Sequence, residues 1–376
     1  MKFLNKNIFV LIALASVLFS CEKEKEDVAP PVAEANLTSY AFTRNGFSTV
    51  EYSGQTTRMN MFDELSSYIS LGNNGITLSV EAMNNMFKNE NAPFADPSLN
   101  ASSKNISSKT YVEDTTVFEQ YFTNLAKSSK PMDSAFIDTA SMGTAGLLYS
   151  NDFSKHYLVD SNGVEWKQLI VKELMGAFLY YQITSVYLSA DKIGSSVDNS
   201  LSVTGKYYTT MEHHFDEAFG YLGVPTNFPT NKEGIRYYGS YADQRNVVLG
   251  LNSKLMDAFI KGRQAIVDRD MTAKWEAVAE IKTNLELVIA GSAIHYLNEA
   301  IANFGDNAIR CHTLSECLGF VKSLKYNIDK TISNEDIASI EASIGMNFYE
   351  VSVSDLNAAK TSLSSIFQLD DSKDIL

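Results

Sequence analysis

Apolar residues recur every three or four positions over long stretches of this chain, and this spacing most constrains its fold. Between residues 164 and 181 the series is Trp166, Ile170, Leu174, Phe178 and Tyr181. That period matches the 3.6 residues of an α-helical turn, so the series predicts a long helix with one buried face. Only 7 prolines occur in the 376 residues, which favours helices over a fold of many short strands. The sequence therefore predicts an all-α helical bundle with minor short strands.

The same spacing predicts further helices and leaves little of the chain for strands. Helices are expected over residues 55–71, 111–126, 164–181, 205–222, 248–266 and 272–304. A bend is expected in the last of these at Gly291-Ser292. Three more helices are expected to begin at Leu314, at Asn334 behind Ser333, and at Asp355 behind Ser354. Residues 85–109 predict a long loop around one short helix. Strands are expected only as minor pieces before about residue 52 and near residues 147–159.

The first 21 residues have the pattern of an export signal. Lys2 and Lys6 precede an apolar run over residues 8–19, which is too short to span a bilayer as a mature helix, and Ser20-Cys21 comes next. The pattern resembles a bacterial lipoprotein signal, in which the cysteine is lipidated and becomes the new N-terminus. An uncleaved anchor helix and an ordinary secretory signal are the alternatives. We expect residues 1–20 to be removed and Cys21 to anchor the mature protein to a membrane, facing out of the cytoplasm.

The residues after this signal divide into a tether and a folded domain. Residues 21–39 are charged and contain Pro30-Pro31, so they predict a flexible tether, and residues 40–376 form the expected folded domain. The whole chain has 45 Asp and Glu against 31 Lys and Arg, a formal net charge of −14. Nucleic acid and anionic lipid would be repelled by such an excess, so neither is expected as a ligand.

Two further cysteines, Cys311 and Cys317, flank a helix-start signal. Thr313-Leu314-Ser315-Glu316 has the form of a capping box, which predicts that a helix opens there. In an oxidising compartment the two cysteines can close a disulfide over this cap, and the alternative is a pair of buried thiols. A metal site at Cys311, His312 and Cys317 is not favoured, because too few partner residues are evident.

The segment around residue 214 holds the first candidate ligand pair. Met211, Phe215, Ala218 and Leu222 define a buried helical stripe, and His214 and Glu217 lie together on its flank. Bundle proteins present histidine and carboxylate ligands inward at this spacing, so the pair predicts half of a metal or anion site, with His213 as a further candidate. The alternative is a boundary histidine that is hydrogen-bonded to Glu217.

A second pair, His295 and Glu299, is four residues apart on another predicted helix. A metal site needs three or more ligands, and one helix offers two, so a second helix must contribute. We therefore expect His214 and Glu217 to converge with His295 or Glu299 around a divalent metal such as iron or zinc. Taken alone, the second pair favours a purely structural role.

Common enzyme motifs are absent. No histidine is followed by glutamate, and the sequence has no Gly-x-Ser-x-Gly elbow, Walker A loop or dinucleotide fingerprint. These absences favour a binding protein over an enzyme.

Three motifs carry a family resemblance: Gly54-Gln55-Thr56-Thr57-Arg58, Met175-Gly176-Ala177, and the segment from Glu212 to Pro225. They resemble the Bacteroidetes lipoproteins with domain of unknown function 4856, from about Tyr40 to near the C-terminus. That family is similar to the imelysin-like helical lipoproteins, which are linked to iron or haem acquisition and were once classed as metallopeptidases. His214 and Glu217 match the imelysin motif Gly-x-His-x-x-Glu, whereas Glu212 occupies its glycine position.

The resemblance implies two packed helical bundles and a function at the cell envelope. We expect a binding lipoprotein of the outer membrane, facing the periplasm or the cell surface, that serves metal or haem capture. One alternative is a metal-dependent hydrolase or peptidase that uses His214 and Glu217. Another is a non-catalytic structural partner of an outer-membrane uptake complex.

Overall fold

The computed structural model describes residues 34–36, 38–130 and 139–376, and it confirms the all-α class. These residues contain 13 α-helices and two small antiparallel sheets. The predicted signal, Cys21 and most of the predicted tether lie outside the described residues. Within the described part of the chain, no helix combines the length and the apolar character needed to cross a membrane.

The first half of the chain contains both sheets and six helices. Their bounds are β1 Glu34–Asn36, β2 Ala41–Arg44, β3 Phe47–Ser48, α1 Ser53–Ser70, α2 Val80–Lys88, α3 Pro97–Asn100, α4 Thr115–Ser128, β4 Gly146–Tyr149, β5 His156–Val159, α5 Trp166–Leu174 and α6 Ala190–Ile193. Strand β2 pairs with β1 and β3, and β4 pairs with β5 in register Gly146 to Val159. The strands after residue 40 therefore lie where the sequence predicted them. Residues 85–88, where the expected loop was to begin, instead form the end of α2.

The second half of the described chain contains helices alone. Their bounds are α7 Thr210–Gly220, α8 Tyr237–Leu249, α9 Leu251–Asp268, α10 Met271–Ala302, α11 Asn307–Ser323, α12 Asn334–Ile344 and α13 Val353–Ile366. Short 3₁₀ segments join several elements: η1 Leu71–Asn74, η2 Ser107–Lys109, η3 Val112–Asp114 and η6 Leu324–Tyr326. Two π-helical segments, η4 Met175–Tyr180 and η5 Gln182–Tyr187, continue α5.

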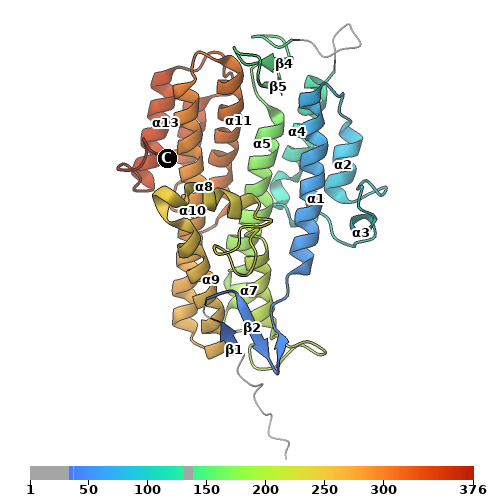
Figure 1. The fold of residues 1–376 in the computed structure, drawn as a ribbon, viewed down its shortest axis with the longest axis vertical. Helices are drawn as coiled ribbons and strands as arrows, with labels where there is room; N and C mark the ends of the chain where they lie inside the picture. Colours follow the sequence, from blue (N-terminus) through green and yellow to red (C-terminus); the bar gives the residue numbers. More distant parts are fainter. Residues whose placement is uncertain (1–33, 37, 131–138) are drawn as a thin grey trace, which may run out of the picture.

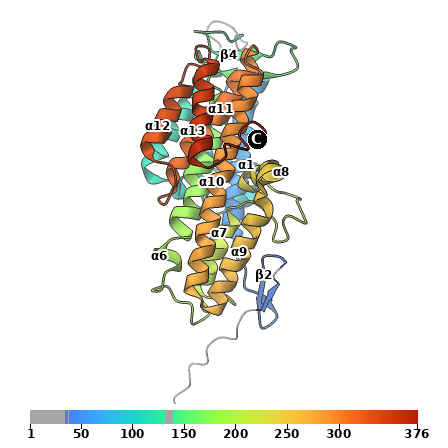
Figure 2. The same ribbon diagram turned by 90° about the vertical axis from the view of Figure 1, so that its left-hand side faces the viewer.

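The longest helix, α10, runs along most of the elongated molecule (Figure 1). Helices α7 and α9 lie toward one end, and α11 and α13 lie beside the other half of α10 (Figures 1 and 2). On the far side of α5, α1 packs against α2, and α2 packs against α4. One apolar cluster extends from Tyr40 to Leu376 through these layers, so the described residues form one elongated bundle with a shared core.

Two glycines shape the helices in the second half of the chain. Gly250, with φ of +65°, divides the helix expected over 248–266 into α8 and α9, because a left-handed residue ends α8. Helix α10 continues as one helix through Gly291 and Ser292, where a bend was expected. The second glycine permits close packing, since a Cβ at Gly291 would lie 3.0 Å from Leu249 Cδ1.

Capping residues account for two boundaries that differ from the prediction. Helix α7 begins at Thr210 rather than near 205, because Thr209 and Glu212 form a capping box. Helix α13 begins at Val353, because Ser352 rather than Ser354 forms the capping box with Asp355.

The expected cap before Leu314 is wrong, and so is the disulfide over it. Helix α11 begins at Asn307 behind Asp306, so Thr313 lies inside the helix and donates to the Ile309 carbonyl at 2.9 Å. Cys311 and Cys317 are free, buried thiols on this continuous helix. Residues six apart on an α-helix face different directions, which keeps the two sulfur atoms apart.

The second half of the helix expected over 164–181 is π-helical. In η4 the Ala177 carbonyl accepts from Tyr111 N at 2.8 Å, and in η5 the Gln182 side chain donates to the Lys109 carbonyl at 2.8 Å. These bonds attach the loop from Lys109 to Tyr111 to the π-helical stretch. Single π turns are rare and occur frequently at functional sites, so this stretch marks the region of interest.

A buried ion-pair network joins β2, α7 and α9. Arg44 donates to both carboxylate oxygens of Glu212 at 2.9 Å, and Arg263 contacts Glu212 at 3.1 Å and Asp216 at 2.9 Å. Tyr40 donates to Asp216 at 2.8 Å. Burial raises the pKa of Asp216 to about 6, although Arg263 acts in the opposite direction. Because Arg263 is 0% exposed, Glu212 and Asp216 compensate its charge, and Thr49 accepts a further hydrogen bond from it at 3.1 Å.

The network predicts a large effect of losing its shared cation. Arg263→Leu should lower the free energy of unfolding by about 3–5 kcal/mol, because Glu212 and Asp216 would remain buried without it. Urea denaturation measures the difference. Lys261→Leu, at an exposed position of the same helix, is the matched control and should change stability by less than about 0.5 kcal/mol. Equal effects of the two substitutions would contradict the assignment.

Candidate functional site

Glu217 of α7 lies at the centre of a hydrogen-bonded cluster formed by four parts of the chain. Its Oε1 accepts from Gln55 Nε2 of α1 at 2.9 Å and from the Tyr187 hydroxyl of η5 at 3.0 Å. Lys109 Nζ donates to the same hydroxyl at 3.1 Å. We call Gln55, Lys109, Tyr187 and Glu217 the Glu217 cluster. Gln55 and Tyr187 are buried, whereas the other two are partly exposed, so the cluster opens to solvent on one side.

The two neighbouring histidines have separate partners. His214 Nδ1 lies 2.6 Å from the Lys192 carbonyl, which only accepts, so this nitrogen carries the proton. Burial lowers the pKa of His214. His213 stacks on Tyr208 with ring centroids 4.6 Å apart, and its Nε2 lies 4.0 Å from Glu217. His214 is a partly buried boundary histidine, as the alternative interpretation expected, but its hydrogen-bond partner is the Lys192 carbonyl rather than Glu217.

The second predicted pair lies elsewhere in the bundle. His295 Nε2 is 3.7 Å from Glu299, and its ring packs edge-on against Tyr296. Burial lowers the pKa of His295, and the charge of nearby Arg245 adds to this effect. Neither residue contacts His214 or Glu217, so the expected convergence is wrong.

The described residues also contain no group of three or more His, Cys, Asp and Glu that could hold a metal. Helical spacing identified which residues share a face, but it does not determine which faces meet. The residues present therefore do not fit an iron or zinc site built from protein side chains alone.

Two of the three sequence motifs, the first and the third, meet at the Glu217 cluster. Gln55, from the first motif, bonds to Glu217, from the third, while Met175-Gly176-Ala177 opens η4. Gly220 permits close contact there, because a Cβ at this position would lie 2.6 Å from Tyr52 Cβ. The first and third motifs thus mark the meeting point of α1 and α7, whereas Gly176 of the second motif packs against Ser323 of α11.

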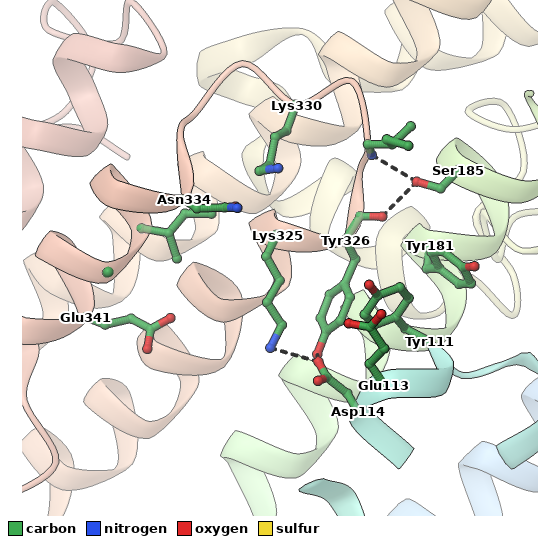
Figure 3. Close-up of a pocket in the computed structure, with 13 residues that line it drawn as sticks. Tyr111, Glu113, Asp114, Tyr181, Ser185, Lys325, Tyr326, Lys330, Asn334 and Glu341 are labelled. Carbon is green, nitrogen blue, oxygen red and sulfur yellow. Dashed lines mark hydrogen bonds and ion pairs between the residues drawn. The ribbon is translucent and has the colours of Figure 1, made fainter. Parts of the chain in front are cut away.

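A pocket of about 630 Å³ lies on the other side of the segment that carries Lys109. Its wall contains three tyrosines, four charged or amide groups of η3 and α12, and two lysines: Tyr111, Tyr181, Tyr326, Glu113, Asp114, Asn334, Glu341, Lys325 and Lys330. We call it the tyrosine pocket. Figure 3 shows Lys330, Asn334 and Glu341 across the cavity from Tyr181, Glu113 and Asp114. The Tyr111 ring packs edge-on against Tyr181 and Tyr326, with centroids 5.2 and 5.8 Å apart.

Most polar groups at the base of the tyrosine pocket are paired with one another. Lys325 Nζ lies 2.8 Å from Asp114, and the Tyr326 hydroxyl donates to the same carboxylate at 2.6 Å (Figure 3). Glu173 lies behind them, and burial raises its pKa. By contrast, Lys330 forms no ion pair within 4 Å in the described part of the chain. The pocket therefore has a rigid, satisfied base and a cation at its edge that is available to a ligand.

The family of this chain follows from a comparison with known sequences. A family described as Domain of unknown function (DUF4856) matches residues 37–366. The chain belongs to the DUF4856 family. No curated protein and no solved structure matches it.

Several site residues of this DUF4856 protein were not predicted. Gln55 lies in the first of the three motifs but was not assigned a role. That motif was the sequence signal that pointed to it. No sequence pattern pointed to Lys109, to Tyr187 or to the residues of the tyrosine pocket. They meet only through the long-range packing of η5 and α12.

The environment of His214 predicts a pH dependence. Its folded pKa is lowered, so below the ordinary value of about 6.5 the unfolded state binds more protons than the folded state. The stability that the folded protein gains from keeping His214 neutral is present above that ordinary pKa and is lost as the pH falls below it. The free energy of unfolding, measured by urea titration at each pH, should therefore fall less for His214→Gln than for wild type when the pH is lowered from about 8 to about 5. Parallel curves for the two proteins would contradict this.

Proposed function

We propose that this DUF4856 protein is a lipid-anchored binding protein of the cell envelope that holds a small ligand in the tyrosine pocket. The observation that carries the proposal is the pocket itself. Its volume of about 630 Å³ lies within the usual range for small-molecule sites, about 300–1,000 Å³. Tyrosine side chains offer an apolar body and a hydroxyl, which is a common combination in ligand binding.

Binding is better supported than catalysis. The Ser185 hydroxyl donates to the Tyr326 carbonyl at 2.9 Å and accepts from Ile328 N at 3.0 Å, so its hydrogen bonds are already made. Among the described residues, the pocket wall contains neither histidine nor cysteine. Hydrolysis by His214 and Glu217 lacks support, because these side chains bind protein groups and do not face each other.

The pocket favours a ligand with a ring and charged groups at its ends. The ring would pack against Tyr111 and Tyr181, and an anionic group would meet Lys330 beside Asn334 (Figure 3). A cationic or hydroxyl group would face Glu113. Capture of iron fits this site only if the metal arrives within an organic complex such as haem, since no protein ligand set is present among the described residues.

Membrane anchoring is the first part of the proposal to test. Cys21→Ser should abolish incorporation of a labelled fatty acid and release the protein from membranes, because the thiol is the acceptor. Cys317→Ser is the matched control, since Cys317 is a buried thiol that only donates to the Ala293 carbonyl. The proposal fails if Cys21→Ser is labelled as strongly as wild type.

Ligand binding in the tyrosine pocket is the second part. Tyramine, 4-hydroxybenzoate, tryptophan and haem combine a ring with different charges, and thermal unfolding with each one measures binding. A ligand at about one hundred times its Kd adds about 2.7 kcal/mol to stability, so its binding raises Tm. The double variant Tyr181→Ala with Lys330→Ala should lose this shift.

The control for that experiment is Tyr149→Ala with Lys127→Ala, which changes exposed residues outside the pocket. The control should keep the shift. If no compound stabilises wild type, or if both double variants respond equally, the pocket is not the binding site and a structural role in an uptake complex becomes the better hypothesis.

A further inference from the structure

Strand β1, which follows the predicted tether, lies beside the tip of the β2–β3 hairpin. Its first residue, Glu34, pairs with Thr43 of β2, and the exposed turn over residues 45–48 comes directly after β2. Figure 1 shows β1 and β2 at one end of the elongated bundle and β4 and β5 at the other end. The predicted tether therefore joins the folded domain next to this hairpin tip.

The hairpin tip and a neighbouring loop expose large apolar side chains. Phe47 of the tip and Leu201 of the loop over residues 201–207 are 54% and 52% exposed, and Val203 and Tyr207 of the same loop are also exposed. The rings of Phe47 and Tyr207 stack with their centroids 4.3 Å apart, so the two segments form one surface. We call the hairpin tip and this loop the tether-end surface.

Backbone contacts hold both parts of the tether-end surface in place. Arg44, at the end of β2, donates to the Tyr207 carbonyl and is also paired with the buried Glu212. The loop is closed at its base, where Ser202 pairs with Thr209. The ion-pair network that orients α7 therefore also fixes the position of this surface.

The charge of the tether-end surface differs from that of the whole chain. Residues 45–48 and 201–207 contain no carboxylate and one cation, Lys206, which is exposed, whereas the chain carries a net charge of −14. Aromatic rings lie at the level of the lipid headgroups in membrane interfaces, and lysine extends its ammonium group to the polar region there. Apolar side chains with one lysine among them therefore fit a lipid surface.

We propose that the tether-end surface rests on the membrane to which Cys21 anchors the protein, with Phe47, Leu201 and Tyr207 in the headgroup region of zwitterionic lipids. This contact presupposes the lipid anchor of the proposed function. Cys21 and Glu34 are 13 residues apart, so their Cα atoms are at most about 45 Å apart. The anchor therefore keeps this end of the bundle near the bilayer, where a weak contact is effectively intramolecular. The net charge of the chain disfavours anionic lipid.

The exposed apolar residues at the other end of the bundle do not fit this role. Tyr149 of β4 and Phe153 of the following turn are exposed, but β4 and β5 lie opposite to the end that carries β1 (Figure 1). The tyrosine pocket is separate as well, because none of its wall residues belongs to the tether-end surface. The membrane contact and ligand binding in the pocket can therefore be measured independently.

Tryptophan fluorescence of the lipidated mature protein on phosphatidylcholine vesicles tests the contact. Phe47→Trp and Tyr207→Trp each place an indole at the tether-end surface, and the emission of wild type, from Trp166 and Trp275, is subtracted. Bromine atoms on the lipid acyl chains should quench about half or more of the added emission, because interfacial indoles lie within their reach. Phe153→Trp is the matched control and should not be quenched, since Phe153 is an exposed aromatic residue at the other end.

Flotation of wild type with the vesicles measures the lipid anchor separately. If wild type floats but neither added indole is quenched more than that of Phe153→Trp, the membrane contact is wrong and the anchor stands. If wild type does not float, both are wrong. A blue shift of the Phe47→Trp emission that grows with protein concentration without vesicles would overturn the proposal and assign the surface to a second copy of this chain. Circular dichroism confirms that each variant folds.

Discussion

The buried contact between Arg263 and the two carboxylates of α7 is the constraint on which the arrangement of this protein depends. Glu212 serves twice, because it closes the capping box that begins α7 and also binds Arg44 and Arg263. Removing a partner from such a network leaves a buried charge, so alternative rotations of α7 are strongly disfavoured. The rotation that remains turns Glu217 toward Gln55 and Tyr187, and the candidate site is a consequence of it.

Helix formation was largely predictable from the sequence, because it depends on local spacing and capping. The apolar period located α1 and α10, and Ser333 correctly predicted the start of α12. Errors arose where tertiary contacts override a local signal. The capping pattern at Thr313 lies inside α11, since Asp306 supplies an earlier and better placed cap. The π-helical stretch after Leu174 has the same apolar spacing as an α-helix, so the pattern could not distinguish the two.

The candidate site was predictable only in part. Glu217 was expected to act with His214, but its hydrogen-bond partners come from α1 and η5, far away in the chain. Net charge was a poor guide as well. The total of −14 is a sum over the whole chain, whereas Lys109 lies close enough to Arg58 that the charge of Arg58, after burial, lowers its pKa. The charge around a given site depends on the fold, and amino-acid composition does not predict it.

The two π-helical segments also limit which insertions and deletions this protein can accept. A π-helical turn closes hydrogen bonds between residues i and i+5 and holds more residues than an α-helical turn, so a change of length that turned η4 or η5 into α-helix would redirect the side chains within them. Tyr187 would leave Glu217 and Ser185 would leave the Tyr326 carbonyl in a single event. The Glu217 cluster and the tyrosine pocket therefore both depend on the length of one segment, residues 175–187.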